Sequence, residues 1–115
     1  MPKGDCYNAN AQALLDWGGK KVPKGSKLCH GEVIKQKDGK VMGHAWIEWD
    51  NTVFDFANGR EITVPKDIYY ALAKREDGVL SGDLKEKIYK YTKKQVREKV
   101  LKYEHWGPWD YNPPR

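Results

Sequence analysis

Apolar and polar residues mix with a period close to two along four stretches of the chain, a pattern typical of half-buried β-strands. The stretches are residues 28–36, 41–49, 52–56 and 84–91, and a shorter extended segment is expected at residues 61–64. Asp38-Gly39 separates the first two stretches and Asp50-Asn51 the next two, and both pairs are typical of tight hairpin loops. The pattern predicts three consecutive antiparallel strands and a fourth strand near the C-terminal end.

Other stretches have helical features. Residues 5–17 combine good helix formers with an apolar side, and residues 93–104 follow a capping-box pattern that starts at Thr92. A shorter helix is expected over residues 65–74, with Pro65 in its first turn. The apolar stripe expected on the helix at 93–104 is Val96, Val100, Leu101 and Tyr103. We therefore predict an α+β fold, with an N-terminal helix packed on an antiparallel sheet of about four strands, plus a C-terminal helix.

The hairpin between the second and third strands holds a histidine on one arm and a carboxylate on the other. With residues 50–51 as a two-residue type I′ loop, Trp46 faces Asp55, and His44 is the diagonal neighbour of Asp55 on the same face. An imidazole–carboxylate hydrogen bond is then within reach. A slip by one residue would place Asn58 opposite His44 and turn Asp55 to the other face.

Length and composition limit the function classes. The 115 residues form a single domain, 1–115, whose tail at residues 105–115 should fold back on the body through its aromatic side chains. The chain has no apolar run long enough to span a membrane, and its first residues lack the apolar centre of a leader peptide, so we expect a cytoplasmic protein. The net charge of +5 is a moderate excess that solubility explains, so a nucleic-acid partner is not expected.

The two cysteines are expected to be free thiols. Cys6 opens the first predicted helix, where backbone amides and the helix dipole favour a thiolate. A cysteine nucleophile needs a base and a group that orients the base, and His44 and Asp55 fit these roles. The position of Cys6 in the sequence is equally consistent with a second role, in which Cys6 is a small buried residue that anchors the helix.

These residues resemble the papain-like fold in its transglutaminase-like form. Members of that superfamily have a cysteine at the start of a helix that packs on an antiparallel sheet, a histidine near the start of one strand and an aspartate on the next. The resemblance covers roughly residues 4–58. The matching motifs are Gly4-Asp5-Cys6-Tyr7-Asn8-Ala9, Gly43-His44-Ala45-Trp46-Ile47-Glu48 and Val53-Phe54-Asp55.

The resemblance implies a cysteine-dependent hydrolase or acyl-transferase that acts on an amide bond through a thioester, without a cofactor. Cys6 would be the nucleophile, His44 the base and Asp55 its orienter. Papain-like peptidases place an oxyanion-hole glutamine several residues before the cysteine, and only five residues precede Cys6 here. The second donor would come from elsewhere, and the candidates are Trp46, Asn8 and Gln12.

The chain is also similar, over nearly its whole length, to small proteins of tailed bacteriophages to which no reaction is assigned. The alternative function is a non-catalytic, phage-type binding protein that uses the same fold to engage a host protein, which the small size of the chain and its tryptophan-rich tail favour. The expected partners are a protein or peptide substrate or a host protein, and the expected state is a monomer in the host cytoplasm. The motifs are Gly4-Asp5-Cys6, His30-Gly31-Glu32-Val33, Gly43-His44-Ala45-Trp46 and Gly107-Pro108-Trp109.

Three further residues are candidates for binding: Trp46, Asn58 and His30. His30 lies on the first strand, where it is either a neighbour of His44 or a structural residue. A zinc site would have to use Cys6, Cys29, His30, His44 or His105. No CxxC or HxxxH pair is present, and the neighbours Cys29 and His30 point to opposite faces of a strand, so no metal is expected.

Overall fold

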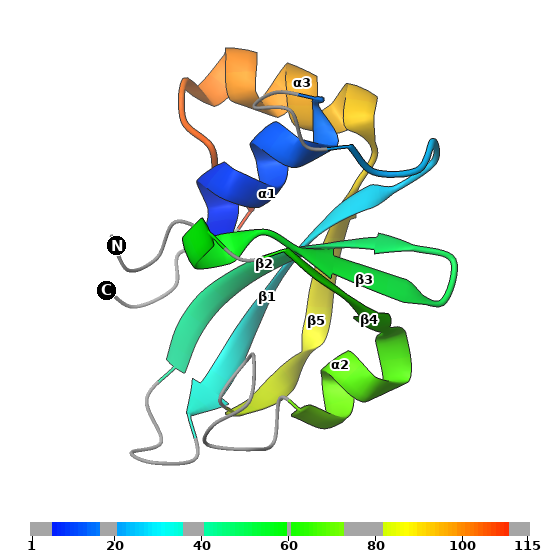
Figure 1. Ribbon diagram of the computed structural model, residues 1–115. Coiled ribbons are helices and arrows are strands. Elements are labelled where there is room, and N and C mark those ends of the chain that lie inside the picture. Colours follow the sequence, from blue (N-terminus) through cyan, green and yellow to red (C-terminus); the bar gives the residue numbers. More distant parts are fainter. Residues whose placement is uncertain (1–5, 17–20, 36–40, 60, 73–81, 111–115) are drawn as a thin grey trace.

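The computed structural model describes residues 6–16, 21–35, 41–59, 61–72 and 82–110. Within these residues, five antiparallel strands form one sheet in the order β4-β3-β2-β1-β5 (Figure 1). The last of the described strands therefore pairs with the first of them, at the edge of the sheet opposite β4. The strands are β1 (Lys27–Lys35), β2 (Val41–Trp49), β3 (Thr52–Asp55), β4 (Ile62–Pro65) and β5 (Gly82–Tyr91).

The α+β class is confirmed, and the four predicted strands correspond to β1, β2, β3 and β5. The short segment expected at 61–64 is a full member of the sheet, so the described sheet has five strands rather than about four. The prediction that Pro65 begins a helix is wrong, because Pro65 is the last residue of β4. Proline is tolerated there because β4 is an edge strand and one of its sides needs no N–H donor.

The register predicted for the central hairpin is confirmed. Ile47 pairs with Phe54 and Trp49 with Thr52 around a two-residue loop, which is the alignment that puts Asp55 on the face of His44. The predicted type I′ geometry of the loop is wrong. It requires positive φ at both loop residues, and only Asp50, with φ 54°, has it.

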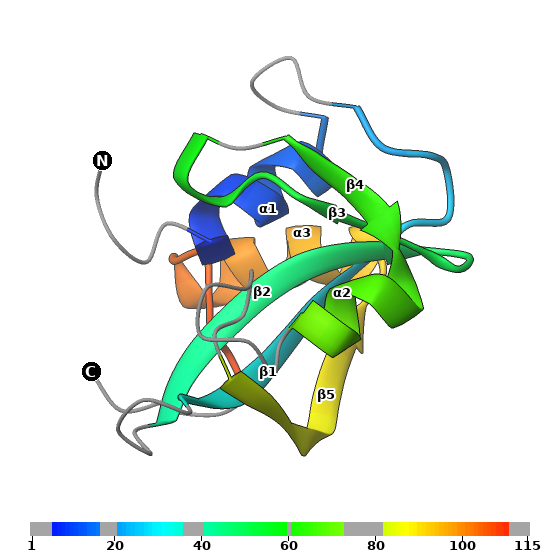
Figure 2. The same ribbon diagram turned by 60° about the horizontal axis from the view of Figure 1, so that its bottom comes forward.

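Helices cover both faces of the sheet. α1 (Cys6–Leu14) and α3 (Lys93–Tyr103) lie on one face, and α2 (Lys66–Leu72) lies on the other (Figures 1 and 2). A short 3₁₀ turn, η1 (Ala57–Gly59), follows β3 and lies beside α1. Apolar side chains pack between the sheet and the helices α1 and α3 and form the core. Among them are Ala11, Leu14, Leu28, Ala45, Ile47 and Val96.

The helix α3 begins with the predicted capping box, in which Thr92 and Gln95 exchange hydrogen bonds. Its apolar stripe is narrower than predicted. Val96 is fully buried, whereas Leu101 is 74% exposed. Five residues turn a helix by about 500°, so Leu101 lies about 140° around the helix from Val96 and points away from the sheet.

The C-terminal tail folds back as predicted, as far as residue 110. The rings of Trp106 and Trp109 are half-buried against the core. The predicted Asp38-Gly39 turn and residues 111–115 of the tail lie outside the described residues. Within the described part of the chain, no helix has the length and apolar character needed to span a membrane.

Candidate functional site

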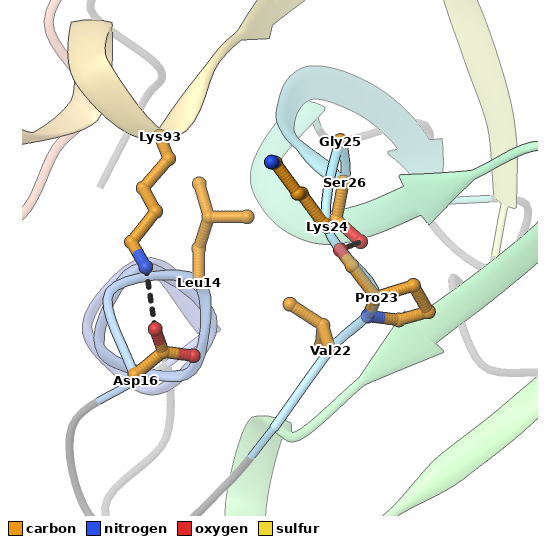
Figure 3. A pocket seen from close by; sticks show the side chains of 8 residues that line it. All are labelled: Leu14, Asp16, Val22, Pro23, Lys24, Gly25, Ser26 and Lys93. Carbon is orange, nitrogen blue, oxygen red and sulfur yellow. Dashed lines mark hydrogen bonds and ion pairs between the residues drawn. The ribbon is translucent and has the colours of Figure 1, made fainter.

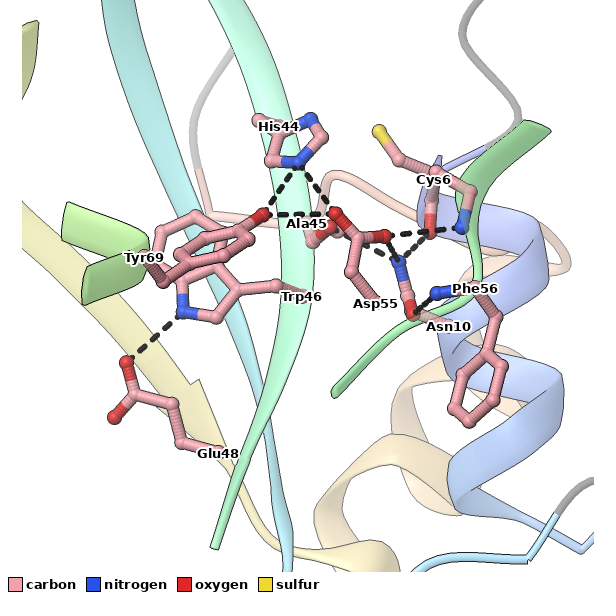
Figure 4. A network of polar contacts seen from close by, with 10 residues as sticks. Cys6, Asn10, His44, Ala45, Trp46, Glu48, Asp55, Phe56 and Tyr69 are labelled. Atoms are coloured by element: carbon pink, nitrogen blue, oxygen red, sulfur yellow. Dashed lines mark hydrogen bonds and ion pairs between the residues drawn. The ribbon is translucent and has the colours of Figure 1, made fainter. Parts of the chain in front are cut away.

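The structure brings Cys6, His44 and Asp55 together where α1 begins and the pairing of β2 with β3 ends (Figure 4). The Nε2 atom of His44 lies 3.3 Å from Oδ2 of Asp55. The Cys6 sulfur lies beside the His44 ring, on the side of the other ring nitrogen, and Cys6 contributes to the electrostatics of the imidazole. All three side chains are buried, with exposed fractions of 5% for Cys6, 8% for His44 and 1% for Asp55.

The end of the β-ladder explains how three elements meet at this point. The described pairing of β2 with β3 runs only from Trp49 to Ile47, so the part of β2 that carries His44 is free to approach the start of α1. Asp55 is the last residue of β3, and its Oδ1 atom accepts a hydrogen bond from the Ala57 amide at 3.0 Å. The backbone turn after β3 therefore fixes the carboxylate while its Oδ2 atom faces His44.

Asn10 on α1 connects the three elements, and it was not among the residues expected at the site. Its side-chain amide donates to the carbonyl oxygen of Ala45 on β2 at 3.0 Å and to Oδ1 of Asp55 on β3 at 3.1 Å. Its side-chain oxygen accepts from the Phe56 amide at 2.9 Å. A signal was present, because Asn10 follows Cys6 by four residues and so shares its face of the helix.

Tyr69 on α2 is the second residue of the cluster that was not expected there, because its spacing in the sequence indicates only an apolar position of a short helix. Its hydroxyl donates to Oδ2 of Asp55 at 2.8 Å and lies 3.0 Å from Nε2 of His44. The hydroxyl hydrogen is used on Asp55, so the oxygen of Tyr69 can only accept from Nε2. His44 therefore carries a proton on Nε2, and its other nitrogen faces Cys6.

The electrostatics of the pair favour its charged form. Burial alone would lower the pKa of His44, but the hydrogen bond with Asp55 and the electrostatic interactions with Cys6 and Asp55 outweigh burial and raise this pKa to about 10. Burial would raise the pKa of Asp55, but the hydrogen bond and charge of His44, with further hydrogen bonds from Ala57 and Asn10, lower it to about 2. At neutral pH the site holds an imidazolium beside a carboxylate.

Trp46 packs beside the site but is not available as an oxyanion-hole donor. Its ring is fully buried and lies nearly parallel to that of His44, with centroids 5.9 Å apart. The indole N–H donates to Oε2 of Glu48 at 2.9 Å and points away from Cys6 (Figure 4). Of the other two candidates, Gln12 donates its side-chain amide to Asn8.

The two cysteines have different surroundings. Cys29 faces the same side of the sheet as Trp46, with which it pairs across the strands. It is fully buried, and burial together with the charge of Glu48 raises the pKa of its thiol far above the usual range. Cys29 is therefore held as a neutral thiol, and it contributes nothing to the cluster around His44.

His30 is not brought to the cluster. It pairs with Ala45, so it lies on the face of the sheet opposite His44. Its ring is fully buried between three aromatic rings whose centroids are 4.8 to 5.0 Å away, and burial lowers its pKa to about 3. Of the two roles left open by the sequence, a neighbour of His44 or a structural residue, His30 therefore has the structural one. The rings belong to Tyr7, Tyr91 and Trp109.

The remaining candidates do not form a site in the described residues. Asn58 lies in η1, and its side chain is outside what the structure describes. Among the described residues, no group of three or more His, Cys, Asp or Glu side chains is arranged to hold a metal ion.

A hollow of about 340 Å³ lies between the end of α1, the loop before β1 and the start of α3 (Figure 3). An ion pair between Asp16 and Lys93 lies beside it, and Leu14, Val22 and Pro23 form its apolar wall. The hollow is at the opposite end of α1 from Cys6, so it is separate from the cluster around His44.

No family model matches the chain, and the searches of curated proteins and of solved structures found no match either.

Proposed function

We propose that the chain is a cysteine-dependent hydrolase or acyl-transferase with a compact papain-like, transglutaminase-like core, acting on an amide bond through a thioester. The observation that carries the proposal is the meeting of Cys6, His44 and Asp55 from three separate elements, with one ring nitrogen of His44 turned to Asp55 and the other to Cys6. A cysteine that only anchors a helix needs neither a buried imidazole at its sulfur nor a carboxylate behind that imidazole.

The geometry suits acyl transfer to sulfur. The Cys6 thiolate attacks the carbonyl carbon of the amide, and a C–S bond forms. The C–N bond then breaks, and the leaving amine takes the proton from the nitrogen of His44 that faces Cys6. Water, for hydrolysis, or a second amine, for transfer, then gives a proton to the same nitrogen as it attacks the thioester carbonyl, and the thiolate leaves.

Asp55 has two functions in this scheme. It keeps the proton on Nε2 of His44, so that the nitrogen facing Cys6 is the one that exchanges protons with the reacting groups. It also stabilises the imidazolium, which the raised pKa of His44 reflects. A protein or peptide is the proposed substrate, and a monomer in the cytoplasm of the producing or host cell is the proposed state.

Alkylation by iodoacetamide at pH 7 tests the proposal. We expect Cys6 to react at least about tenfold faster than Cys29, because a thiolate reacts and a buried neutral thiol does not. We expect His44→Ala to slow the labelling of Cys6 by at least about tenfold, since the thiolate loses its imidazolium. His105→Ala is the matched control, because His105 is exposed and lies outside the cluster.

Mass spectrometry after tryptic digestion assigns the label to each cysteine. Equal and slow labelling of both cysteines would rule out the enzyme and leave the non-catalytic binding protein as the remaining function. Fast labelling of Cys6 that is unchanged in His44→Ala would show that the thiol is reactive without a base, which also contradicts the proposed mechanism.

A further inference from the structure

The hydroxyl of Tyr69 lies between the base and the carboxylate of the proposed site. The direct contact from Nε2 of His44 to Oδ2 of Asp55 is 3.3 Å, beyond the usual range for an N–H···O hydrogen bond. The two contacts that pass through Tyr69 are shorter, 3.0 Å from Nε2 to the hydroxyl oxygen and 2.8 Å from that oxygen to Oδ2. The better hydrogen bonds between base and carboxylate are therefore those of Tyr69.

The ring of Tyr69 is held firmly enough for its hydroxyl to fix a proton position. It is fully buried and packs at a centroid distance of 6.1 Å against Trp46, which in turn stacks beside His44. The hydroxyl reaches the site from α2, on the face of the sheet opposite α1, which carries Cys6. Tyr69 and Cys6 thus approach the His44 ring from different elements, one at each ring nitrogen.

We infer that Tyr69 is a positioning residue of this site, whose hydroxyl links Asp55 to His44 and holds a proton on Nε2, so that the nitrogen facing Cys6 is the one that exchanges its proton with the reacting groups. The inference rests on the proposed function, because the position of that proton matters only if His44 serves as a base for Cys6. It adds a fourth residue, from a fourth element, to the three that the sequence indicated.

The charged groups around His44 decide the direction of the expected effect. Cys6 on α1 and Asp55 on β3 face the ring directly, and the hydroxyl of Tyr69 faces it from α2. On β2 itself the nearest charged side chain is Glu48, which pairs with Lys66 and Lys90. Loss of the Tyr69 hydroxyl removes an acceptor from the imidazolium, so the thiolate–imidazolium pair becomes less stable and forms only at higher pH.

The test is the pH–rate profile of Cys6 alkylation by iodoacetamide in the full chain, from pH 5 to pH 9. In Tyr69→Phe we expect the midpoint to rise by about one pH unit, which is about a tenfold loss of rate on the acidic side. The shift is limited to this size because Nε2 can still turn fully to Asp55. Tyr91→Phe is the matched control, since it removes a buried hydroxyl that bonds Asp110 rather than His44, and its midpoint should not move.

The outcomes separate this inference from the proposed function. Fast labelling of Cys6 that depends on His44 but keeps the same midpoint in Tyr69→Phe would overturn the inference alone. The same holds if Tyr69→Phe lowers the melting temperature without moving the midpoint, because a purely structural role would do that. Slow labelling of Cys6 in the unmodified chain would overturn the proposed function, and the inference with it.

A second measurement keeps the inference testable if Tyr69→Phe does not fold. In the unmodified chain labelled with ¹⁵N-histidine, the nitrogen chemical shifts report the protonation of each ring nitrogen of His44. We expect Nε2 to stay protonated from pH 5 to pH 11, and the nitrogen that faces Cys6 to be the one that loses its proton as the pH rises past about 10. An unprotonated Nε2 anywhere in this range would overturn the inference, because the hydroxyl of Tyr69 would then donate to the ring instead of accepting from it.

Discussion

Replacement of Asn10 by alanine tests how the site is held together. The Asn10 side chain is fully buried and contacts four groups, which lie on three elements and on the segment that follows β3. Its amide has two hydrogens for three acceptor oxygens, so these contacts are partly shared. The contacted groups are the carbonyl oxygens of Cys6 and Ala45, Oδ1 of Asp55 and the amide of Phe56.

The cost of Asn10→Ala follows from these contacts. Each buried polar group that loses its partner costs about 1–3 kcal/mol. Oδ1 of Asp55 still accepts the hydrogen bond from the Ala57 amide, so the loss of Asn10 costs least at this atom. The remaining losses at Ala45 and Phe56, with the small cavity, add up to about 3–5 kcal/mol. This cost is a large part of the free energy of unfolding of a domain of this size, which is roughly 5–15 kcal/mol.

Urea unfolding followed by tryptophan fluorescence measures the effect, since the chain has five tryptophans. At an m-value of about 2 kcal/mol per M, we expect the midpoint to fall by about 2 M. Asn8→Ala on the same helix is the control, because Asn8 is exposed and bonds only the side chain of Gln12 among the hydrogen bonds described; it should change stability by less than about 0.5 kcal/mol.

A loss of less than about 1 kcal/mol in Asn10→Ala would refute the reasoning, because it would mean that the buried partners of Asn10 find other partners without cost. A loss of the expected size together with slower labelling of Cys6 would show that the same side chain supports both the fold and the site.

Two further predictions concern the buried histidines. In the folded chain the pKa of His30 is lowered to about 3 and that of His44 is raised to about 10, whereas both have a pKa of 6.5 in the unfolded chain. The free energy of unfolding should therefore fall by up to about 1.4 kcal/mol per pH unit on either side of pH 6.5. Below pH 6.5 only the unfolded chain binds a proton at His30, and above pH 6.5 only the folded chain keeps a proton at His44. Urea unfolding at pH 4.5, 6.5 and 8.5 measures both slopes. A loss of stability at acidic pH that persists in His30→Leu would contradict the attribution of that slope to His30. Gly107→Ala should cost about 2–3 kcal/mol, because a Cβ there would lie 2.8 Å from Cε1 of His30 at a residue with φ 119°. Gly25→Ala, with φ 90° and open space around it, should cost only about 1 kcal/mol, and equal costs for the two would show that crowding against His30 is unimportant.

Local sequence signals determined most of the elements and the geometry of the central hairpin. The period-two pattern and the short Asp50-Asn51 loop fix which face each side chain takes, because a slip of one residue would expose the whole buried set. His44 and Asp55 were therefore placed on one face from sequence alone, and their contact follows. The capping box at Thr92 is equally local, since its two hydrogen bonds join residues three apart.

Other features depend on how the elements pack. Nothing in the sequence near Tyr69 shows that its hydroxyl reaches His44, because that contact is set by where α2 crosses the sheet. His30 and His44 are both strand histidines, yet one is held neutral among aromatic rings and the other is held charged beside Asp55. The sequence determined which residues share a face; only the tertiary structure decided which groups meet, because hydrogen bonds and pKa values depend on distances of a few ångströms between segments far apart in the chain.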